Sequence, residues 1–199
     1  KRVTDKKAVK IVEMVLSGDL NKNIVSSINN QGGSGVGISG KDASLVICEK
    51  DNPELGYVGK PIHINTKLIT TLVENDFIPV ISPIGTNEEG ETFNINADTM
   101  AGTIASALKA DRLLLLTDVS GVKDKSGNKI EKASTEAIKK LIKENVIKDG
   151  MIPKVNTAID SIEKGVRAVV ILDGSIQNAC LLELFTDHGV GTLIRKELN

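Results

Sequence analysis

Three short segments hold the residues whose types and spacing suit chemistry. They read "NINAD" (94–98), "TDVSGV" (117–122) and "KDGMIPK" (148–154), and each lies beside a turn, at a strand end or a helix start. Together they supply side-chain amides, a carboxylate and a lysine, which can position a small molecule and balance charge on a phosphoryl group. Phosphoryl transfer needs such positioning and electrostatics more than it needs covalent chemistry.

"NINAD" has more polar side chains than a helix start requires. An N-cap by Asn96 or Asp98 would use one of them. Asn94 is then left without a capping role, and its amide can donate to and accept from a neutral or carboxylate-bearing small molecule. Asp98, near the helix N-terminus, could hold a lysine or order a metal-bound phosphate.

The other two segments suit a nucleotide. The Ser and Gly of 117–122 follow the most hydrophobic run and can offer backbone amides to a phosphate or base, although an ordinary turn explains them equally well. Lys154 lies at the start of a helical pattern, where the helix dipole disfavours a cation. This conflict favours an anionic ligand beside Lys154 over the alternative of a solvated surface lysine.

Alternating helical and strand patterns position these segments. The runs "LLLL" (113–116) and "AVVIL" (168–172) are typical of strands covered on both faces. The alternation predicts an α/β sandwich with a mainly parallel sheet, in which ligands bind beyond the carboxyl ends of the strands. Thr4 or Asp5 is expected to cap the first helix. Helices are predicted over 4–16, 21–30, 66–76, 96–110, 134–146, 152–165 and 175–187, and strands over 44–48, 56–64, 77–85, 111–117, 167–174 and 191–194, the first two strands as a hairpin.

Composition excludes several function classes. The 199 residues are 40% hydrophobic and 26% charged with a net charge of −1, so we expect a globular domain that binds no nucleic acid. One Tyr, three Phe and no Trp leave few stacking platforms for single strands. No apolar run approaches the roughly 20 residues of a membrane span. Cys48 and Cys180 form no CxxC pair, which predicts core thiols in a reducing cytoplasm and no metal site.

Two familiar glycine motifs do not fit. "GVGISG" (35–40) matches GxGxxG, but a predicted helix precedes it and a strand follows, the reverse of the order that a dinucleotide site needs. Extended to "GVGISGKD", the stretch resembles a P-loop with Asp42 where magnesium requires a hydroxyl. A Ser–His–Asp hydrolase would be expected to show a GxSxG elbow, which the sequence lacks.

The ordered motifs "NINADTMAG", "LLLLTDVSGV", "DGMIPKV" and "LLELFTDHGVGTLI" resemble the N-acetylglutamate kinases of the amino acid kinase family. "RVTD" (2–5) and "VISPIG" (80–85) match too, so the resemblance covers essentially the whole chain. It implies a three-layer αβα sandwich that transfers the γ-phosphate of ATP, bound with Mg²⁺, to the side-chain carboxylate of N-acetyl-L-glutamate in arginine biosynthesis. The chain would be one domain, with 1–95 belonging to the substrate lobe and 96–199 forming the nucleotide lobe.

The resemblance also implies roles for individual residues. Arg2 and Asn94 would bind the substrate, Asp98 would orient the catalytic lysines, and Lys154 would stabilise the transferring phosphoryl group. No general base is needed, because the attacking carboxylate is ionised at neutral pH. Two stretches would line the nucleotide site: Asp118, Val119, Ser120, Gly121, Val122 and Lys123, and Val146, Ile147 and Lys148.

The front of the sequence departs from the family. The family carries an N-terminal lysine–glycine–glycine strand end and a second glycine triplet, neither of which appears in the 199 residues. We expect a front segment to be missing and predict that the printed chain alone does not turn over.

The C-terminal motif resembles the arginine-inhibited branch of the family. Glu183, Gly189 and Gly191 would bind arginine, and a homodimer or a hexamer built as a trimer of dimers is expected. Rival acceptors are an amino-adipate derivative, glutamate, aspartate, carbamate and UMP. A non-catalytic sensor of arginine or nucleotide is the rival from another class.

Overall fold

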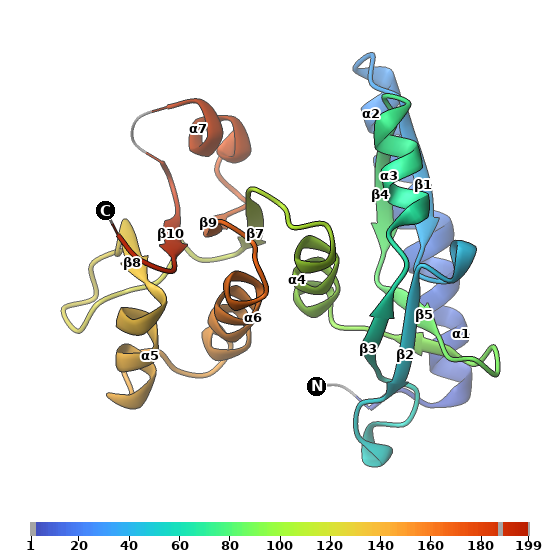
Figure 1. Ribbon diagram of the computed structural model, residues 1–199, viewed down its shortest axis with the longest axis horizontal. Helices are drawn as coiled ribbons and strands as arrows, with labels where there is room; N and C mark the ends of the chain where they lie inside the picture. Colours follow the sequence, from blue (N-terminus) through green and yellow to red (C-terminus); the bar gives the residue numbers. More distant parts are fainter. Residues whose placement is uncertain (1–2, 187–188, 199) are drawn as a thin grey trace. The chain divides into compact units, whose positions relative to one another are not determined.

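The computed structural model describes residues 3–186 and 189–198 (Figure 1). The chain divides into two compact units, Lys1–Met100 and Ala101–Asn199. The assignment of a substrate lobe and a nucleotide lobe remains a prediction from the sequence.

One continuous helical run opens the first unit. It comprises α1 (Lys6–Glu13), a π-helix (Met14–Leu20) and α2 (Asn21–Asn30). Asp5 is the N-cap, because its Oδ1 accepts from the backbone N–H groups of Lys7 at 2.9 Å and Ala8 at 2.7 Å. The predicted break between two helices is wrong: the N–H of Asn21 bonds to the Leu16 carbonyl five residues back, which carries the helix across the gap.

The strands of the first unit form two sheets. β1 (Gly35–Ser39) pairs in parallel with β4 (Ile78–Ser82), and β2 (Val46–Lys50) forms the predicted hairpin with β3 (Gly59–Ile64). The second sheet has the order β3-β2-β5-β6, with β5 at Ile84–Thr86 and β6 at Thr92–Asn94. The strand predicted over 77–85 is split at Pro83, which has no N–H to give to a ladder. Helix α3 (Lys67–Glu74) lies where the periodicity places it.

The second unit is a mixed sheet with helices. Its strand order is β7 (Leu113–Thr117), β9 (Val169–Asp173), β10 (Thr192–Arg195) and β8 (Lys132–Ser134), with β7 parallel to β9 and β10 antiparallel to β9 (Figure 1). Strand β8, which the sequence did not predict, is a three-residue strand parallel to β10. The elements are α4 (Ala97–Ala107), which begins in the first unit, β7 (Leu113–Thr117), β8 (Lys132–Ser134), α5 (Thr135–Lys143), α6 (Met151–Glu163), β9 (Val169–Asp173), α7 (Ala179–Phe185) and β10 (Thr192–Arg195).

Strand β9 is the centre of the second core. Residues 169–172 are all fully buried, as the apolar run predicted. The run in β7 behaves differently, because Leu113 and Leu115 are buried while Leu116 is 49% exposed. β7 stands at one end of its sheet, so its second face is less covered than predicted. Each fully buried aliphatic side chain stabilises the fold by about 1.5–3 kcal/mol before entropy is counted.

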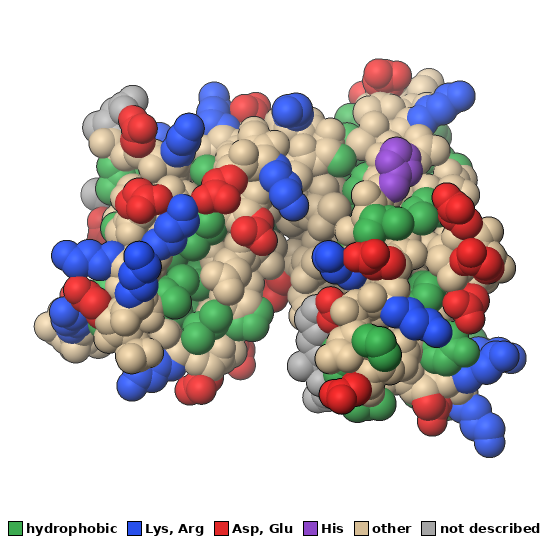
Figure 2. All heavy atoms as spheres, turned by 60° about the horizontal axis from the view of Figure 1, so that its bottom comes forward, with side chains coloured by type: hydrophobic (Ala, Val, Ile, Leu, Met, Phe, Trp, Pro, Cys, Tyr) green, Lys and Arg blue, Asp and Glu red, His purple; other side chains and the backbone are tan. Residues whose placement is uncertain are grey.

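The predicted α/β class with parallel pairing is confirmed. Within residues 3–186 and 189–198, no helix is long and apolar enough to cross a bilayer. On the face drawn in Figure 2, lysine and arginine side chains intermix with aspartate and glutamate, in keeping with the near-zero net charge.

Candidate active site

The start of α4 separates the roles of the two asparagines in "NINAD". Asn96 is the cap, because its Oδ1 accepts from the Thr99 backbone N–H at 3.0 Å and from the Thr99 hydroxyl at 3.3 Å. Asp98 lies in the first helical turn, where the helix dipole favours a carboxylate. Asn94 is the last residue of β6 and takes no part in this cap.

The backbone of Asn94 is fixed from two sides. It pairs with Ile84 in the β5–β6 ladder, and its N–H donates to the carbonyl of Tyr57 at 2.9 Å. The preceding Phe93 is fully buried, with its ring centroid 6.2 Å from that of Tyr57. A half-buried amide on such a rigid strand end is suited to holding a small ligand in one orientation.

The loop after β7 forms one wall of a cavity in the second unit. Val122 is fully buried and anchors the loop, and its N–H donates to Thr192 Oγ1 at 2.9 Å. Gly121 has a φ of +130°, and a β-carbon there would lie 2.5 Å from the same Thr192 oxygen. Only glycine therefore fits at position 121 without moving the loop.

The segment between α5 and α6 forms the opposite wall. The N–H groups of Val146 and Ile147 donate to the Leu141 carbonyl at 3.0 and 3.3 Å, which turns the chain directly after α5. The two walls enclose a cavity of about 200 Å³. Its lining residues are Val119, Gly121, Val122, Lys123, Val146, Ile147, Lys148 and Met151.

The structure thus gathers both predicted nucleotide stretches around one cavity. Asp118 and Ser120 belong to the same loop but do not line it. Met151 was missed by the sequence analysis, although it stands inside the quoted "KDGMIPK" motif. Its long apolar side chain at a helix start was the available signal.

Lys154 lies in the first turn of α6, as predicted. The helix begins after Gly150, which has no side chain to cap it, and the first turn, all of it described, holds no acidic residue. The N–H groups of Met151 and Ile152 donate to the carbonyls of Lys148 and Asp149, and Pro153 has no N–H. An anion here would therefore be attracted by the charge of Lys154 and by the helix dipole. Val155, beside Lys154, is fully buried and holds this turn against the core.

A second cavity in this unit, of about 390 Å³, collects the residues assigned to arginine. Glu183 of α7 is only 9% exposed, and its Oε2 accepts from the Gly191 N–H at 3.2 Å. A β-carbon at Gly189 would collide with the same carboxylate. The lining residues are Arg112, Glu131, Lys132, Glu183, Leu184, Thr186, Gly189, Gly191 and Leu193, of which the sequence analysis assigned only Glu183, Gly189 and Gly191 to arginine.

The carboxyl group of Asp173, at the end of β9, has a lowered pKa. Asp173 ends β9 opposite Thr117, and hydrogen bonds from the Ser175 hydroxyl and N–H lower the pKa of its carboxyl. Arg2, assigned to the substrate, lies outside the described residues. Among the described residues, no cluster of histidine, cysteine, aspartate and glutamate side chains has the arrangement of a metal site.

Comparison with known proteins fixes the family. The profile of the Amino acid kinase family matches residues 1–173. The chain belongs to this family.

Curated relatives are closely similar along the chain. It is 58% identical to the acetylglutamate kinase of Ruegeria pomeroyi over 99% of this chain and 69% of that protein. It is 57% identical to that of Paracoccus denitrificans over 98% of this chain and 64% of the relative. The chain thus spans about two thirds of the length of these relatives.

Solved structures share the fold. A crystal structure of a Streptococcus mutans UA159 protein is 33% identical with a TM-score of 0.82, over 98% of this chain and 74% of that one. The N-acetylglutamate synthase of Neisseria gonorrhoeae is 24% identical with a TM-score of 0.88, over 99% of this chain and 46% of that one.

Proposed function

We propose that this chain belongs to a cytoplasmic kinase that transfers the γ-phosphoryl group of ATP to the side-chain carboxylate of N-acetyl-L-glutamate, a step of arginine biosynthesis. The observation that carries the proposal is the 58% identity, over 99% of the chain, to an acetylglutamate kinase. The cavity between the loop after β7 and the start of α6 supports it, because it is lined by the residues that the family resemblance assigns to the nucleotide.

The chemistry needs little from the protein beyond placement and charge. A carboxylate oxygen of the acceptor attacks the γ-phosphorus, the bond to the β–γ bridging oxygen breaks, and ADP leaves with that electron pair. The acceptor carboxyl, with a pKa near 4.3, is already ionised at pH 7, so no base is required. Lys154, in the first turn of α6, would stabilise the transferring group, a contribution worth several kcal/mol in comparable sites.

The residues around the cavity fit a nucleotide. The exposed Val119 and the half-buried Met151 offer apolar surface to the face of a purine, with the buried Val122 and Ile147 behind it, and Lys123 and Lys148 offer charge to phosphates. Mg²⁺ bound to ATP would add neutralisation of the phosphate charge. Asn94 would hydrogen-bond the acetylated acceptor, and the family resemblance assigns to Asp98 the role of orienting catalytic lysines.

The proposal is tested by ADP release from MgATP with the chain extended by its native N-terminal segment. N-acetyl-L-glutamate, its amino-adipate counterpart, glutamate, aspartate, carbamate and UMP are offered in parallel. We expect turnover with acetylglutamate, lost by about 100-fold or more in Lys154→Ala. Lys164→Ala, an exposed lysine at the other end of α6, is the matched control and should be unaffected. Turnover with a different acceptor overturns the substrate, and nucleotide or arginine binding without turnover favours the sensor.

We infer further that the cavity at Glu183 binds arginine as a feedback inhibitor. A nearly buried carboxylate in a cavity lined by polar groups is a suitable partner for a guanidinium. Millimolar arginine is expected to slow the complete enzyme, and Glu183→Gln to remove that inhibition. An unchanged wild-type rate with arginine would exclude this role.

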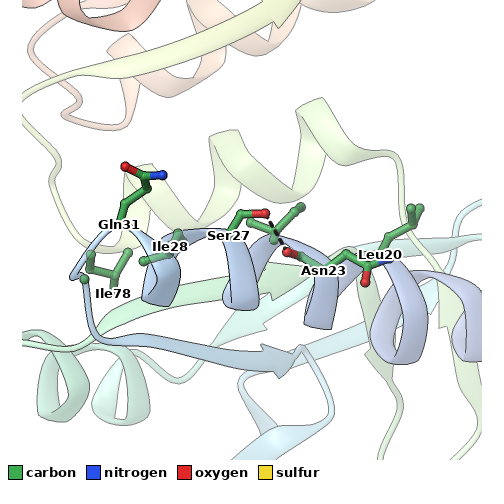
Figure 3. A pocket seen from close by; sticks show the side chains of 8 residues that line it. Leu20, Asn23, Ser27, Ile28, Gln31 and Ile78 are labelled. Atoms are coloured by element: carbon green, nitrogen blue, oxygen red, sulfur yellow. Dashed lines mark hydrogen bonds between the residues drawn. The ribbon is translucent and has the colours of Figure 1, made fainter.

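We also infer a homodimer through the exposed apolar face of the first helical run. The apolar groove on α2, of about 610 Å³, is lined by Leu20, Asn23, Ile24, Ser27, Ile28, Gln31, Gly33 and Ile78 (Figure 3). Met14 is 64% exposed and Ile24 is 52% exposed, which favours a covered surface. Light scattering should give the mass of a dimer, or of a hexamer if dimers assemble further. Ile24→Asp should dissociate this assembly, and Ser26→Asp should leave it intact. A wild-type monomer would contradict the inference.

A further inference from the structure

The nucleotide loop is the loop after β7, residues 118–123. It continues into a β-hairpin whose base is closed by hydrogen bonds. The Ile130 N–H donates to the Val122 carbonyl at 2.8 Å, and Lys123 and Lys129 form the next bridge. The tip closes where the Asp124 N–H donates to the Asn128 carbonyl at 2.9 Å. Movement of the base at Val122 and Ile130 would therefore move the wall of the nucleotide cavity.

One buried hydroxyl on β10 forms hydrogen bonds to both strands at the base of the hairpin. Thr192 is completely buried, and its Oγ1 accepts from the Val122 N–H at 2.9 Å and donates to the Ile130 carbonyl at 2.6 Å. A further hydrogen bond lies at the neighbouring residue of the hairpin, where Lys129 Nζ donates to the Val190 carbonyl at 3.0 Å. The segment Val190–Thr192 thus sets the position of the hairpin.

The same segment contacts the other cavity. The Gly191 N–H donates to Glu183 Oε2, and a β-carbon at Gly191 would lie 2.6 Å from the Ile171 carbonyl, so the segment is packed tightly against β9. Gly191 and Thr192 are neighbours joined by a planar peptide bond. A displacement of Gly191 at the Glu183 carboxylate would therefore act on the adjacent Thr192 hydroxyl.

We propose that Thr192 is the positioning residue that links the Glu183 cavity to the nucleotide loop, so that a cationic ligand at Glu183 weakens nucleotide binding. The inference rests on the proposed function of the two cavities. A guanidinium at Glu183 competes with the Gly191 N–H for Oε2, the segment shifts, and the Thr192 hydroxyl no longer holds Val122 and Ile130 in the binding geometry. By linkage, nucleotide must weaken the cationic ligand by the same factor.

The test measures ADP affinity by calorimetry with and without L-arginine. In the wild type, arginine should weaken ADP by about fivefold. Thr192→Val keeps the shape but leaves the Val122 N–H and the Ile130 carbonyl unpaired, so ADP should bind about fivefold more weakly and the effect of arginine should fall below about twofold. Thr192→Ser keeps the hydroxyl, so it should keep both the wild-type ADP affinity and the wild-type effect of arginine on that affinity.

If Thr192→Val does not fold, Lys129→Met provides a second variant nearer the surface. It removes the hydrogen bond to the Val190 carbonyl and should reduce the effect of arginine on ADP affinity. A merely structural role for Thr192 would lower the melting temperature and leave the ratio of ADP affinities with and without arginine unchanged. An ADP affinity that arginine does not alter in the wild type, or an arginine effect that survives in the variants, overturns the inference alone. Absence of ADP binding in the wild type overturns the proposed function and the inference with it.

Discussion

At the scale of single residues, the two asparagines before α4 have different roles: one caps the helix, and the other is the residue predicted to bind the substrate. Asn96 satisfies an N–H of the first turn, whereas Asn94 lies at the end of β6, where its N–H donates to the carbonyl of Tyr57. The polar surplus in this segment was visible in the sequence. The sequence left the cap open between Asn96 and Asp98, because the choice depends on where the helix begins.

Substitution of these residues should separate stability from binding. Asn96→Ala removes the cap and should lower the free energy of unfolding by about 1 kcal/mol, with little change in the KM for acetylglutamate. Asn94→Ala should leave stability nearly unchanged and raise that KM by about tenfold or more, because a hydrogen bond to the substrate is lost. Urea unfolding and initial rates measure both quantities; a KM unchanged in Asn94→Ala would contradict the assignment.

The two thiols should differ sharply in reactivity. Cys48 is 2% exposed, and burial raises the pKa of its thiol from 9.0 to about 12, so the reactive thiolate is scarce at neutral pH. Cys180 is only partly buried. In Cys180→Ser, Ellman's reagent should modify Cys48 at a rate limited by unfolding, while Cys48→Ala should react quickly. Fast labelling of native Cys180→Ser would show that the core around β2 opens.

At the scale of elements, periodicity predicted the helices and most strands, and tertiary contacts supplied the rest. The π-helix that joins α1 to α2 depends on hydrogen bonds five residues apart, which have no sequence period of their own. Strand β8 has three residues and exists because β10 pairs with it. Arg112, Glu131 and Lys132 reach the Glu183 cavity only through the folding of three separate segments, so no local pattern could indicate them.

The nucleotide loop depends on a glycine for space as well as for conformation. Gly121 and Gly127 both have positive φ values, +130° and +83°, but only at Gly121 would a β-carbon meet other atoms within 4 Å. Gly127→Ala should therefore cost about 1 kcal/mol of stability through strain and leave ADP affinity nearly unchanged. Gly121→Ala should displace the loop and weaken ADP by about tenfold or more. Equal ADP affinities in the two variants would contradict the role of the loop.

At the scale of the whole molecule, each unit has its own buried strands, and the two cavities discussed for ADP and arginine both lie in Ala101–Asn199. The α/β class and the family follow from the sequence, because alternating patterns and four ordered motifs persist along the chain. The division after Met100 lies inside α4, close to the lobe boundary between residues 95 and 96 that the family resemblance implied, but helical periodicity alone does not mark it.

Hydrogen exchange should show this distribution of ligand sites. ADP is expected to slow exchange at residues 118–123 and 146–151, and arginine at residues 183–186 and 189–191, because bound ligands shield the backbone that lines each cavity. Helix α2, which lines neither cavity, serves as the internal control. Protection by ADP that appears at α2 and spares both loops would contradict the placement of the nucleotide.

The central claim is that a carboxylate accepts the phosphoryl group. The most direct measurement traps the acyl phosphate with hydroxylamine, which displaces phosphate and leaves a hydroxamate that mass spectrometry identifies. With MgATP, acetylglutamate and the chain carrying its native N-terminal segment, the account predicts the side-chain hydroxamate of N-acetyl-L-glutamate, in an amount equal to the ADP released. ADP release without this hydroxamate, or a hydroxamate formed only from another acceptor, would contradict it.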